Sequence, residues 1–134
     1  FSAHIQGEEI SDPRLVTLLA DIAGELVGFA QLRLAQPTTS IKRDRPAELH
    51  RIYISSKWHG RGVASELMRA VYAAAANAGS DCLWLGVWER NLKAIAFYRK
   101  YGFSVVGDHV FMLGQDQQRD LIMEAPLGSQ SSDA

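Results

Sequence analysis

One join between an expected strand and an expected helix restricts the fold of this chain more than any other segment. Residues 52–54 are β-branched or aromatic, a loop with two glycines follows, and apolar residues then recur at helical spacing from Val63. The first turn of such a helix offers backbone N–H groups without intrahelical partners, at the positive end of the helix dipole. Gly60 and Gly62 have no Cβ atom, so a phosphate can approach the backbone closely. The segment therefore predicts a pyrophosphate site.

The spacing of the glycines distinguishes between the known kinds of phosphate loop. A P-loop requires a lysine directly after its last glycine, and none follows Gly62. A dinucleotide-binding loop requires a third glycine where this chain has Ser65, although Glu89 supplies an acidic residue at the end of the next expected strand. Taken by itself, the segment also fits a tight connection whose glycines serve packing only.

A second motif lies downstream of this loop. Residues 59–64 (His-Gly-Arg-Gly-Val-Ala) resemble the Gln/Arg-x-x-Gly-x-Gly/Ala signature of the GNAT superfamily of acyl-coenzyme A-dependent N-acyltransferases. Residues 91–103 resemble the other hallmark of that family, Asn-x-x-Ala-x-x-Phe-Tyr-x-x-x-Gly-Phe. His59 departs from the signature, where the family usually has Gln or Arg, but its backbone N–H can still serve. The resemblance extends over roughly residues 15–127.

Hydrophobic periodicity predicts an α/β (α+β) chain. The expected strands are residues 15–22, 26–34, 48–54, 82–88, 103–111 and 120–127, the last two joined by a polar loop at 114–119. The expected helices are residues 60–78 and 91–101. By resemblance they form the acyl-CoA N-acyltransferase fold, a mixed, mostly antiparallel sheet with splayed central parallel strands, flanked by helices. Only residues 1–14 precede the first expected strand, so we expect the chain to be N-terminally short and to lack the first strand and helices that wall the acceptor site in that family.

Length and composition fit a single N-acetyltransferase domain at residues 1–127, followed by a polar, disordered tail at 128–134. A net charge of −1 disfavours a nucleic-acid partner. No apolar stretch reaches the roughly 18 residues of a membrane span, so no membrane partner is expected. The lone Cys82 has no partner for a disulfide, which favours a cytoplasmic location. The four scattered histidines predict no metal site.

The resemblance implies acetyl-CoA as cosubstrate and assigns its contacts. Main-chain groups of Ile52 and Ile54 would hold the pantetheine arm in the gap between the splayed strands. Asn91 would meet the cofactor while capping its helix, next to Ala94, and Arg99 and Lys100 are both open as partners of the 3′-phosphate. The pyrophosphate would lie on the backbone N–H groups of His59, Gly60, Arg61, Gly62, Val63 and Ala64, with Arg61 adding charge.

Acetyl transfer to an amine requires a base and an acid. A lysine-like amine with a pKa near 10.4 is mostly protonated at pH 7, and deprotonating it costs about 4 to 5 kcal/mol. Glu48, on the third expected strand, is the first candidate for the base, and His50 lies on the same face by alternation. By resemblance, Tyr98 faces the cofactor sulfur and can donate its phenol proton to the leaving thiolate. The alternatives are paired polar strand residues for Glu48 and His50, and a core aromatic for Tyr98.

The acceptor is left open by the sequence. Residues 85–91 and 110–120 resemble a bacterial subgroup often associated with polyamine acetylation, while a peptide N-terminus, a lysine side chain and an amino sugar stay open. Two other functions are also open: a non-catalytic acyl-CoA sensor or regulatory module, and a fragment of a dinucleotide-binding oxidoreductase. A homodimer through the last strands is a further expectation. An amine would find anionic surroundings at Glu89, Asp108, Asp116 and Asp120.

Overall fold

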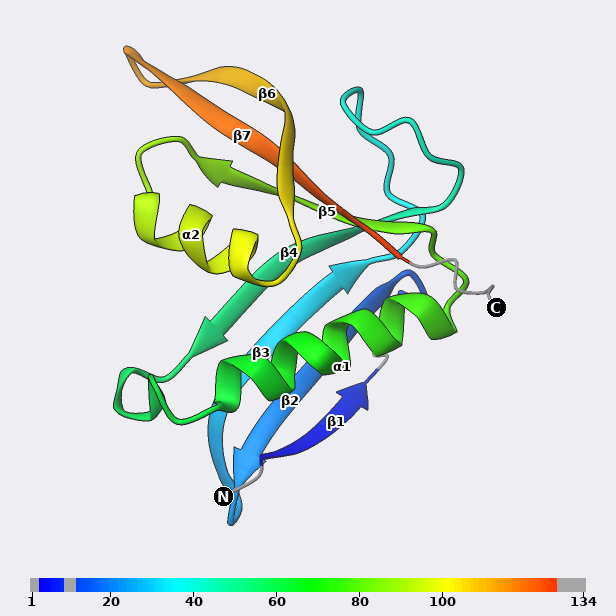
Figure 1. Cartoon of the computed structure of the whole chain (residues 1–134), viewed down its shortest axis with the longest axis vertical. Helices are drawn as coiled ribbons and strands as arrows, with labels where there is room; N and C mark the ends of the chain where they lie inside the picture. The colour runs from blue at the N-terminus through cyan, green and yellow to red at the C-terminus, as the bar shows by residue number, and fades with distance from the viewer. Residues whose placement is uncertain (1–2, 9–11, 128–134) are drawn as a thin grey trace.

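The computed structural model describes residues 3–8 and 12–127, so the expected tail at 128–134 lies outside the described residues. Two helices and a short 3₁₀ turn interrupt a series of strands (Figure 1). The elements in chain order are β1 (His4–Glu8), β2 (Leu15–Ile22), β3 (Glu25–Arg33), β4 (Pro46–Ile54), η1 (Ser56–Trp58), α1 (Val63–Asn77), β5 (Cys82–Trp88), α2 (Leu92–Lys100), β6 (Ser104–Leu113) and β7 (Asp116–Pro126).

The strands form one seven-stranded sheet in the order β1-β2-β3-β4-β5-β7-β6. Every neighbouring pair is antiparallel except β4 and β5, which are parallel. A parallel pair requires a long crossover, and α1 supplies it between these two strands (Figure 1). The expected mixed, mostly antiparallel sheet is confirmed.

The parallel strands β4 and β5 diverge after a short stretch of pairing. Only three residue pairs join them, from Pro46↔Cys82 to Glu48↔Trp84. Beyond that point β4 continues to Ile54 along β3, while β5 continues to Trp88 along β7. The facing edges of the two strands therefore carry backbone groups that no strand pairing satisfies. The expected splay is confirmed, and it opens the middle of the sheet.

A β-bulge in β4 sets the direction of the side chains at this opening. Gln31 pairs with Arg51 and Leu32 pairs with Leu49, so His50 is an extra residue without an opposite partner. Strict alternation would place Leu49 and Ile52 on opposite faces, yet Leu49 is buried in the core and Ile52 packs against the same core. The sequence did not predict this change of face.

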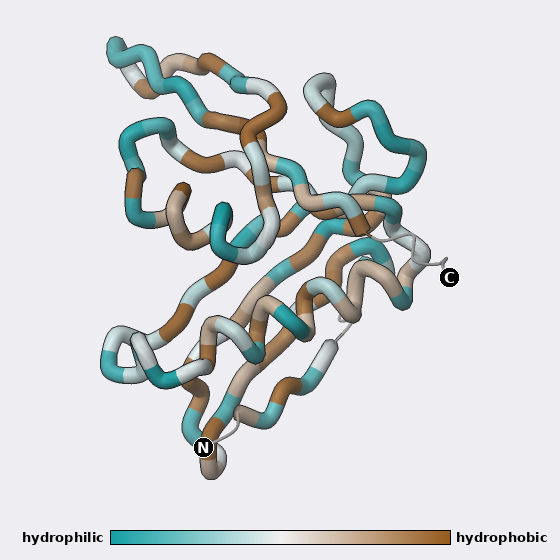
Figure 2. The backbone as a smooth tube through the Cα atoms, viewed as in Figure 1, coloured by the Kyte–Doolittle hydropathy of each residue, from teal (hydrophilic) through white to brown (hydrophobic). Residues whose placement is uncertain are grey.

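Both helices lie on the same side of the sheet and pack against each other. Helix α1 crosses β2 and β3, and α2 lies beside β4 and β5 (Figure 1). The Ser65 and Tyr101 hydroxyls are 2.6 Å apart, and the Tyr72 hydroxyl donates to the Tyr101 carbonyl. Apolar residues follow the strands, whereas the β3–β4 loop and the tip of the β6–β7 hairpin are hydrophilic (Figure 2). The residues of α1 in the core are Val63, Leu67, Met68, Val71 and Ala75.

Two expectations about the sheet are wrong. A strand, β1, precedes β2 and pairs with it antiparallel from His4↔Asp21 to Glu8↔Thr17, where none was expected. Its sequence, His-Ile-Gln-Gly-Glu, has a single large apolar residue and so no readable pattern. Strand β7 begins at Asp116, so residues 116–119 are not a loop. These polar residues pair with β6 in an exposed hairpin. Backbone hydrogen bonds stabilise this part of the hairpin, which has no apolar face.

Leu67 tests the core beneath the site. Its side chain is fully buried, so Leu67→Ala leaves a cavity and is expected to lower the free energy of unfolding by about 2 to 5 kcal/mol. Urea denaturation followed by circular dichroism measures the change. Arg69→Ala, at an exposed position of the same helix, is the control and is expected to stay within about 0.5 kcal/mol. Equal losses in both variants would contradict the packing described here.

Candidate active site

The first of three clefts around the sheet opening has a volume of about 600 Å³ and is bounded by the end of β4, the start of α1 and the whole of α2. Most of the cofactor contacts expected from the sequence meet here. The expected residues that line it are Ile52, Ile54, His59, Gly60, Gly62, Ala64, Asn91 and Ala94.

The two loop glycines have the left-handed backbone that favours glycine. The φ angles are +76° at Gly60 and +84° at Gly62, and a Cβ atom at either position would meet nothing within 4 Å. Gly62 is also the N-cap of α1 and brings no side chain to bond its first turn. Exposed N–H groups, a positive dipole end and free space coincide at this point, which is the arrangement an anion requires.

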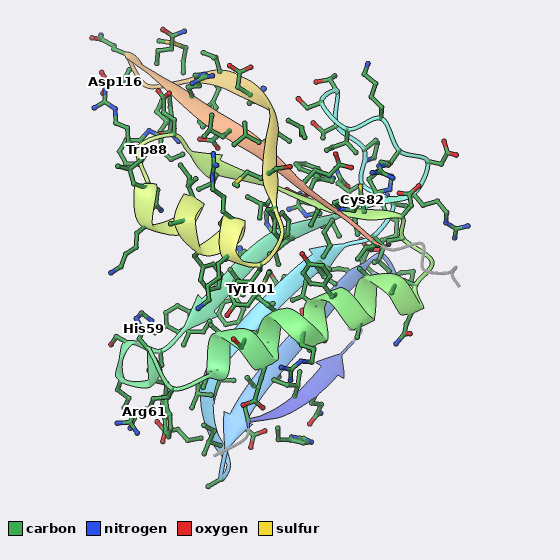
Figure 3. All side chains as sticks on the ribbon, in the orientation of Figure 1. His59, Arg61, Cys82, Trp88, Tyr101 and Asp116 are labelled. Carbon is green, nitrogen blue, oxygen red and sulfur yellow. The ribbon has the colours of Figure 1, made fainter. Side chains whose placement is uncertain are left out.

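His59 and Arg61 have different roles in the loop between β4 and α1 (Figure 3). The His59 Nε2 atom is 2.8 Å from the Ile54 carbonyl oxygen, and because a carbonyl only accepts, Nε2–H is the donor. This bond ties the loop to the end of β4. The Arg61 guanidinium lies over the Trp58 ring, 5.4 Å from its centroid, and does not line the cleft. The side chain of Val63 is in the core, so only its backbone faces the loop.

Helix α2 supplies the opposite wall. The Asn91 Oδ1 atom accepts from the Ala94 N–H at 3.2 Å, which confirms the expected cap. Of the two basic residues left open, Lys100 lines the cleft and Arg99 does not. Lys93, two turns before Lys100 and therefore on a nearby face, was missed, although this spacing was visible in the sequence. The other lining residues that the sequence did not identify are Trp58, Ser65, Phe97 and Tyr101.

Tyr98 does not line this cleft, in contrast to Tyr101, three residues further along the chain. Its ring packs edge-on against Phe97 and Phe103, with centroids 5.4 Å and 5.8 Å away. Burial raises the pKa of the Tyr98 phenol above its ordinary value, so the group stays protonated across the physiological range. Within residues 3–8 and 12–127, the Tyr98 hydroxyl makes no hydrogen bond, so its proton has no protein acceptor there.

A second cleft, of about 350 Å³, contains both candidate bases. Glu48 belongs to the last residue pair before β4 and β5 diverge. Its neighbours Ala47 and Leu49 are buried in the core with α1, so by alternation the Glu48 side chain faces away from α1. Both clefts thus border the opening in the sheet, one at Glu48 and the other at Ile52 and Ile54. The second cleft is lined by Thr38, Glu48, Leu49, His50, Trp84, Gly86, His109, Asp120 and Ile122.

Arg33 contacts both candidate bases of this cleft. Its Nη2 atom is 3.0 Å from His50 Nε2, and a guanidinium can only donate, so Nε2 accepts and the ring proton is on Nδ1. Nδ1 is 3.9 Å from Glu48 Oε2, and Arg33 Nη1 is 3.7 Å from Glu48 Oε1. The Nε2 atom of His50 is therefore occupied by Arg33. The Glu48 carboxylate, 15% exposed, is the group left to accept a proton.

Only one of the four expected acidic residues reaches the second cleft. Asp120 lines it, and one of its oxygens accepts from Gln118 Nε2 at 3.1 Å. Glu89 and Asp108 both bind Arg119, at 2.8 Å and 2.7 Å, so they are already neutralised. The fourth, at the start of β7, is exposed at the far end of the hairpin (Figure 3).

Residues 3–8 and 12–127 offer neither a metal site nor a reactive thiol. No group of three or more His, Cys, Asp or Glu side chains there is arranged to hold a metal ion. Cys82 is fully buried, and burial, reinforced by Glu124 and Asp81, raises the pKa of its thiol to about 12. The thiol is therefore no nucleophile near neutral pH. Neither helix in these residues combines the length and apolarity needed to cross a membrane.

Comparison with known proteins decides the family. The sequence profile of the acetyltransferase (GNAT) family matches residues 2–103. The chain belongs to this family. By family it is an N-acetyltransferase whose cosubstrate is acetyl-CoA, which rules out the alternative of a dinucleotide-binding oxidoreductase.

Individual relatives support the assignment. An uncharacterised N-acetyltransferase of Mycobacterium tuberculosis is 38% identical over 120 residues, which cover 90% of this chain and 72% of that protein. The L-amino acid N-acetyltransferase of Escherichia coli is 35% identical over 108 residues, covering 79% and 64%. A GNAT acetyltransferase of Elizabethkingia anophelis, solved with acetyl-CoA bound, shares the fold, with a TM-score of 0.72, 15% identity, and 94% and 99% of the two chains covered.

Proposed function

We propose that this GNAT acetyltransferase transfers an acetyl group from acetyl-CoA to a primary amine by direct attack in a ternary complex. The observation that carries the proposal is that two separate clefts border the divergent part of β4, one at Glu48 and the other at Ile52 and Ile54. One cleft has the features of a phosphate site and the other contains a carboxylate base. A thioester that enters through the opening would meet an amine from the other cleft.

The first cleft suits the cosubstrate along its length. The backbone N–H groups of residues 60–64 would bind the pyrophosphate, and Lys93 and Lys100 would add charge for the phosphates. The His59 N–H, expected from the sequence to take part, already donates to the Ser56 carbonyl at 3.2 Å. The pantetheine amides would pair with backbone groups of Ile52 and Ile54, which face the gap without a strand partner on that side. Asn91 caps α2 and faces the same space.

Glu48 would act as the base, through a water molecule. It accepts one proton from the acceptor ammonium, and the neutral nitrogen then attacks the thioester carbonyl carbon. The new C–N bond forms as the C–S bond breaks, and the second nitrogen proton leaves to solvent. The Nε2 atom of His50 already accepts a hydrogen bond from Arg33. Its Nδ1 atom is directed to Glu48 and would orient the carboxylate.

Tyr98 would protonate the leaving thiolate. A thiol has a pKa near 8.5 and a phenol a pKa near 10, so the thiolate alone is a weak base for this phenol. Solvent or the attacking amine then returns a proton to the Tyr98 phenolate, which completes the catalytic cycle. The packing of Tyr98 against Phe97 and Phe103 fixes the ring, and its hydroxyl has no partner among the described residues to compete for it. The inert Cys82 thiol favours direct attack over an acetyl-enzyme.

Isothermal titration of acetyl-CoA and of NADH into the purified chain tests the cofactor half of the proposal. We expect acetyl-CoA to bind with a micromolar dissociation constant and NADH not to bind. Binding of NADH, or of neither compound, would refute it. Binding of acetyl-CoA without any thiol release on an amine panel would instead favour the acyl-CoA sensor.

Gly62→Ala tests the phosphate loop. Alanine at a φ of +84° is strained, by about 1 kcal/mol or more, and the loop is expected to relax away from the geometry that directs its N–H groups. The dissociation constant for acetyl-CoA should rise about tenfold or more. Gly114→Ala is the matched control, because it too has a positive φ, +62°, and open space, but lies in the β6–β7 turn. An equal weakening in both variants would count against the assignment.

A further inference from the structure

A third cleft, of about 400 Å³, adjoins the site of the candidate base. His50 lines both this cleft and the second one, so the two are neighbours across its ring. The third cleft has a different charge from the second, because two guanidinium groups face it. Its lining residues are Asp12, Arg14, Leu15, Gln31, Arg33, Leu34, Gln36 and His50.

The two arginines of this cleft have unused donors. Arg33 makes one hydrogen bond, to Nε2 of His50, and its nearest carboxylate oxygen, on Glu48, is 3.7 Å away. Its side chain is 43% exposed. The Arg14 guanidinium makes no hydrogen bond or ion pair to any described residue. The cleft's one acid, Asp12, accepts the Arg14 backbone N–H at 2.9 Å. Two like charges that face one space repel each other, and a planar anion would relieve this repulsion.

We propose that the acceptor carries a carboxylate, held by Arg33 and Arg14, and presents its amine to Glu48 in the second cleft. This inference rests on the proposed function. Arg33 is 3.0 Å from His50 and 3.7 Å from Glu48, so the cation and the base are close neighbours. A ligand that reaches both has its amine and its carboxylate on the same carbon or on adjacent carbons. The acceptor class is therefore a free amino acid, and a polyamine, which has no anion, is disfavoured by the two arginines.

Matched acceptors test the carboxylate directly. Thiol release is measured with phenylalanine, phenylalaninamide, phenethylamine and spermidine at fixed acetyl-CoA. We expect kcat/KM for the amino acid to exceed that of each other amine at least tenfold. Arg14→Gln should lower kcat/KM for phenylalanine at least tenfold more than for phenylalaninamide, mainly through KM. Arg69→Gln, on the exposed surface of α1, should change neither. Equal rates for the acid and the amide, or a preference for spermidine, would overturn the proposal.

A binding measurement separates failure of this inference from failure of the proposed function. Calorimetry with N-acetylphenylalanine and N-acetylphenylalaninamide needs no turnover. The acid should bind at least tenfold more tightly than the amide, and Arg14→Gln should remove that difference. Should every amine fail to release thiol while the acid still binds selectively, the chemistry assigned to Glu48 and Tyr98 is wrong and the carboxylate site stands. Equal binding of the acid and the amide overturns the carboxylate site, whatever the activity.

Discussion

Glu48→Gln is expected to lower kcat for acetyl transfer by about 10² to 10⁴-fold, the usual contribution of a positioned general base. The amide keeps the size of the carboxylate but cannot take a proton from the acceptor ammonium. Affinity for acetyl-CoA should be unchanged, because Glu48 lines the second cleft and not the first. Stopped assays of thiol release and calorimetric titration give the two quantities.

The pH dependence of this variant provides an internal check. As pH rises toward the pKa of the acceptor amine, the acceptor loses its proton in solution and no longer needs a base. The kcat of Glu48→Gln should therefore recover relative to that of the parent chain. His50→Gln is the companion variant. We expect it to lose less kcat than Glu48→Gln, because the Nε2 atom of His50 already accepts a hydrogen bond from Arg33. A larger loss in His50→Gln than in Glu48→Gln would assign the base to His50.

Tyr98→Phe is expected to lower kcat by about 10²-fold while leaving stability within about 0.5 kcal/mol. The phenol oxygen makes no hydrogen bond to any described residue, so its removal breaks no such bond. Because burial raises the pKa of Tyr98, the folded chain keeps this proton to a higher pH than an exposed tyrosine does, and the advantage over Tyr98→Phe should persist into the alkaline range.

Tyr72→Phe is the matched control for this result. Its hydroxyl donates to the Tyr101 carbonyl, so its loss should cost about 1 kcal/mol of unfolding free energy. Tyr72 lines none of the three clefts, and kcat should not change. If Tyr98→Phe is as active as Tyr72→Phe, then Tyr98 is a packing residue and another group protonates the thiolate.

Local rules were enough to predict the glycine loop at residues 59–64 and the two helices. Gly60 and Gly62 have positive φ angles, which glycine alone adopts readily, and Asn91 caps its helix as its side chain favours. The two motifs lie at α1 and α2, on either side of β5, and this order along the chain already implies the crossover through α1. Features that depend on one residue and its near neighbours were therefore visible in the sequence.

Features that depend on distant pairing were not. The bulge at His50 arises from the register with β3, which no local pattern records. The contact of Arg33 with His50 joins residues 17 positions apart on neighbouring strands, so the sequence named Glu48 as the first candidate base without the reason that this contact adds. The face of α2 that lines the first cleft contains Phe97 and Tyr101. Tyr98 instead packs against Phe103, and this contact depends on how α2 packs against the start of β6.

Thiol release coupled to mass spectrometry of the product tests the central claim most directly. The purified chain, acetyl-CoA and a panel of primary amines are incubated, and free coenzyme A and N-acetylated amine are both quantified. The proposed mechanism predicts that the two products form in equal amounts, only when an amine is present, and that Glu48→Gln and Tyr98→Phe each abolish most of both. Tight binding of acetyl-CoA with no acetylated amine from any acceptor would contradict it and identify the chain as a sensor.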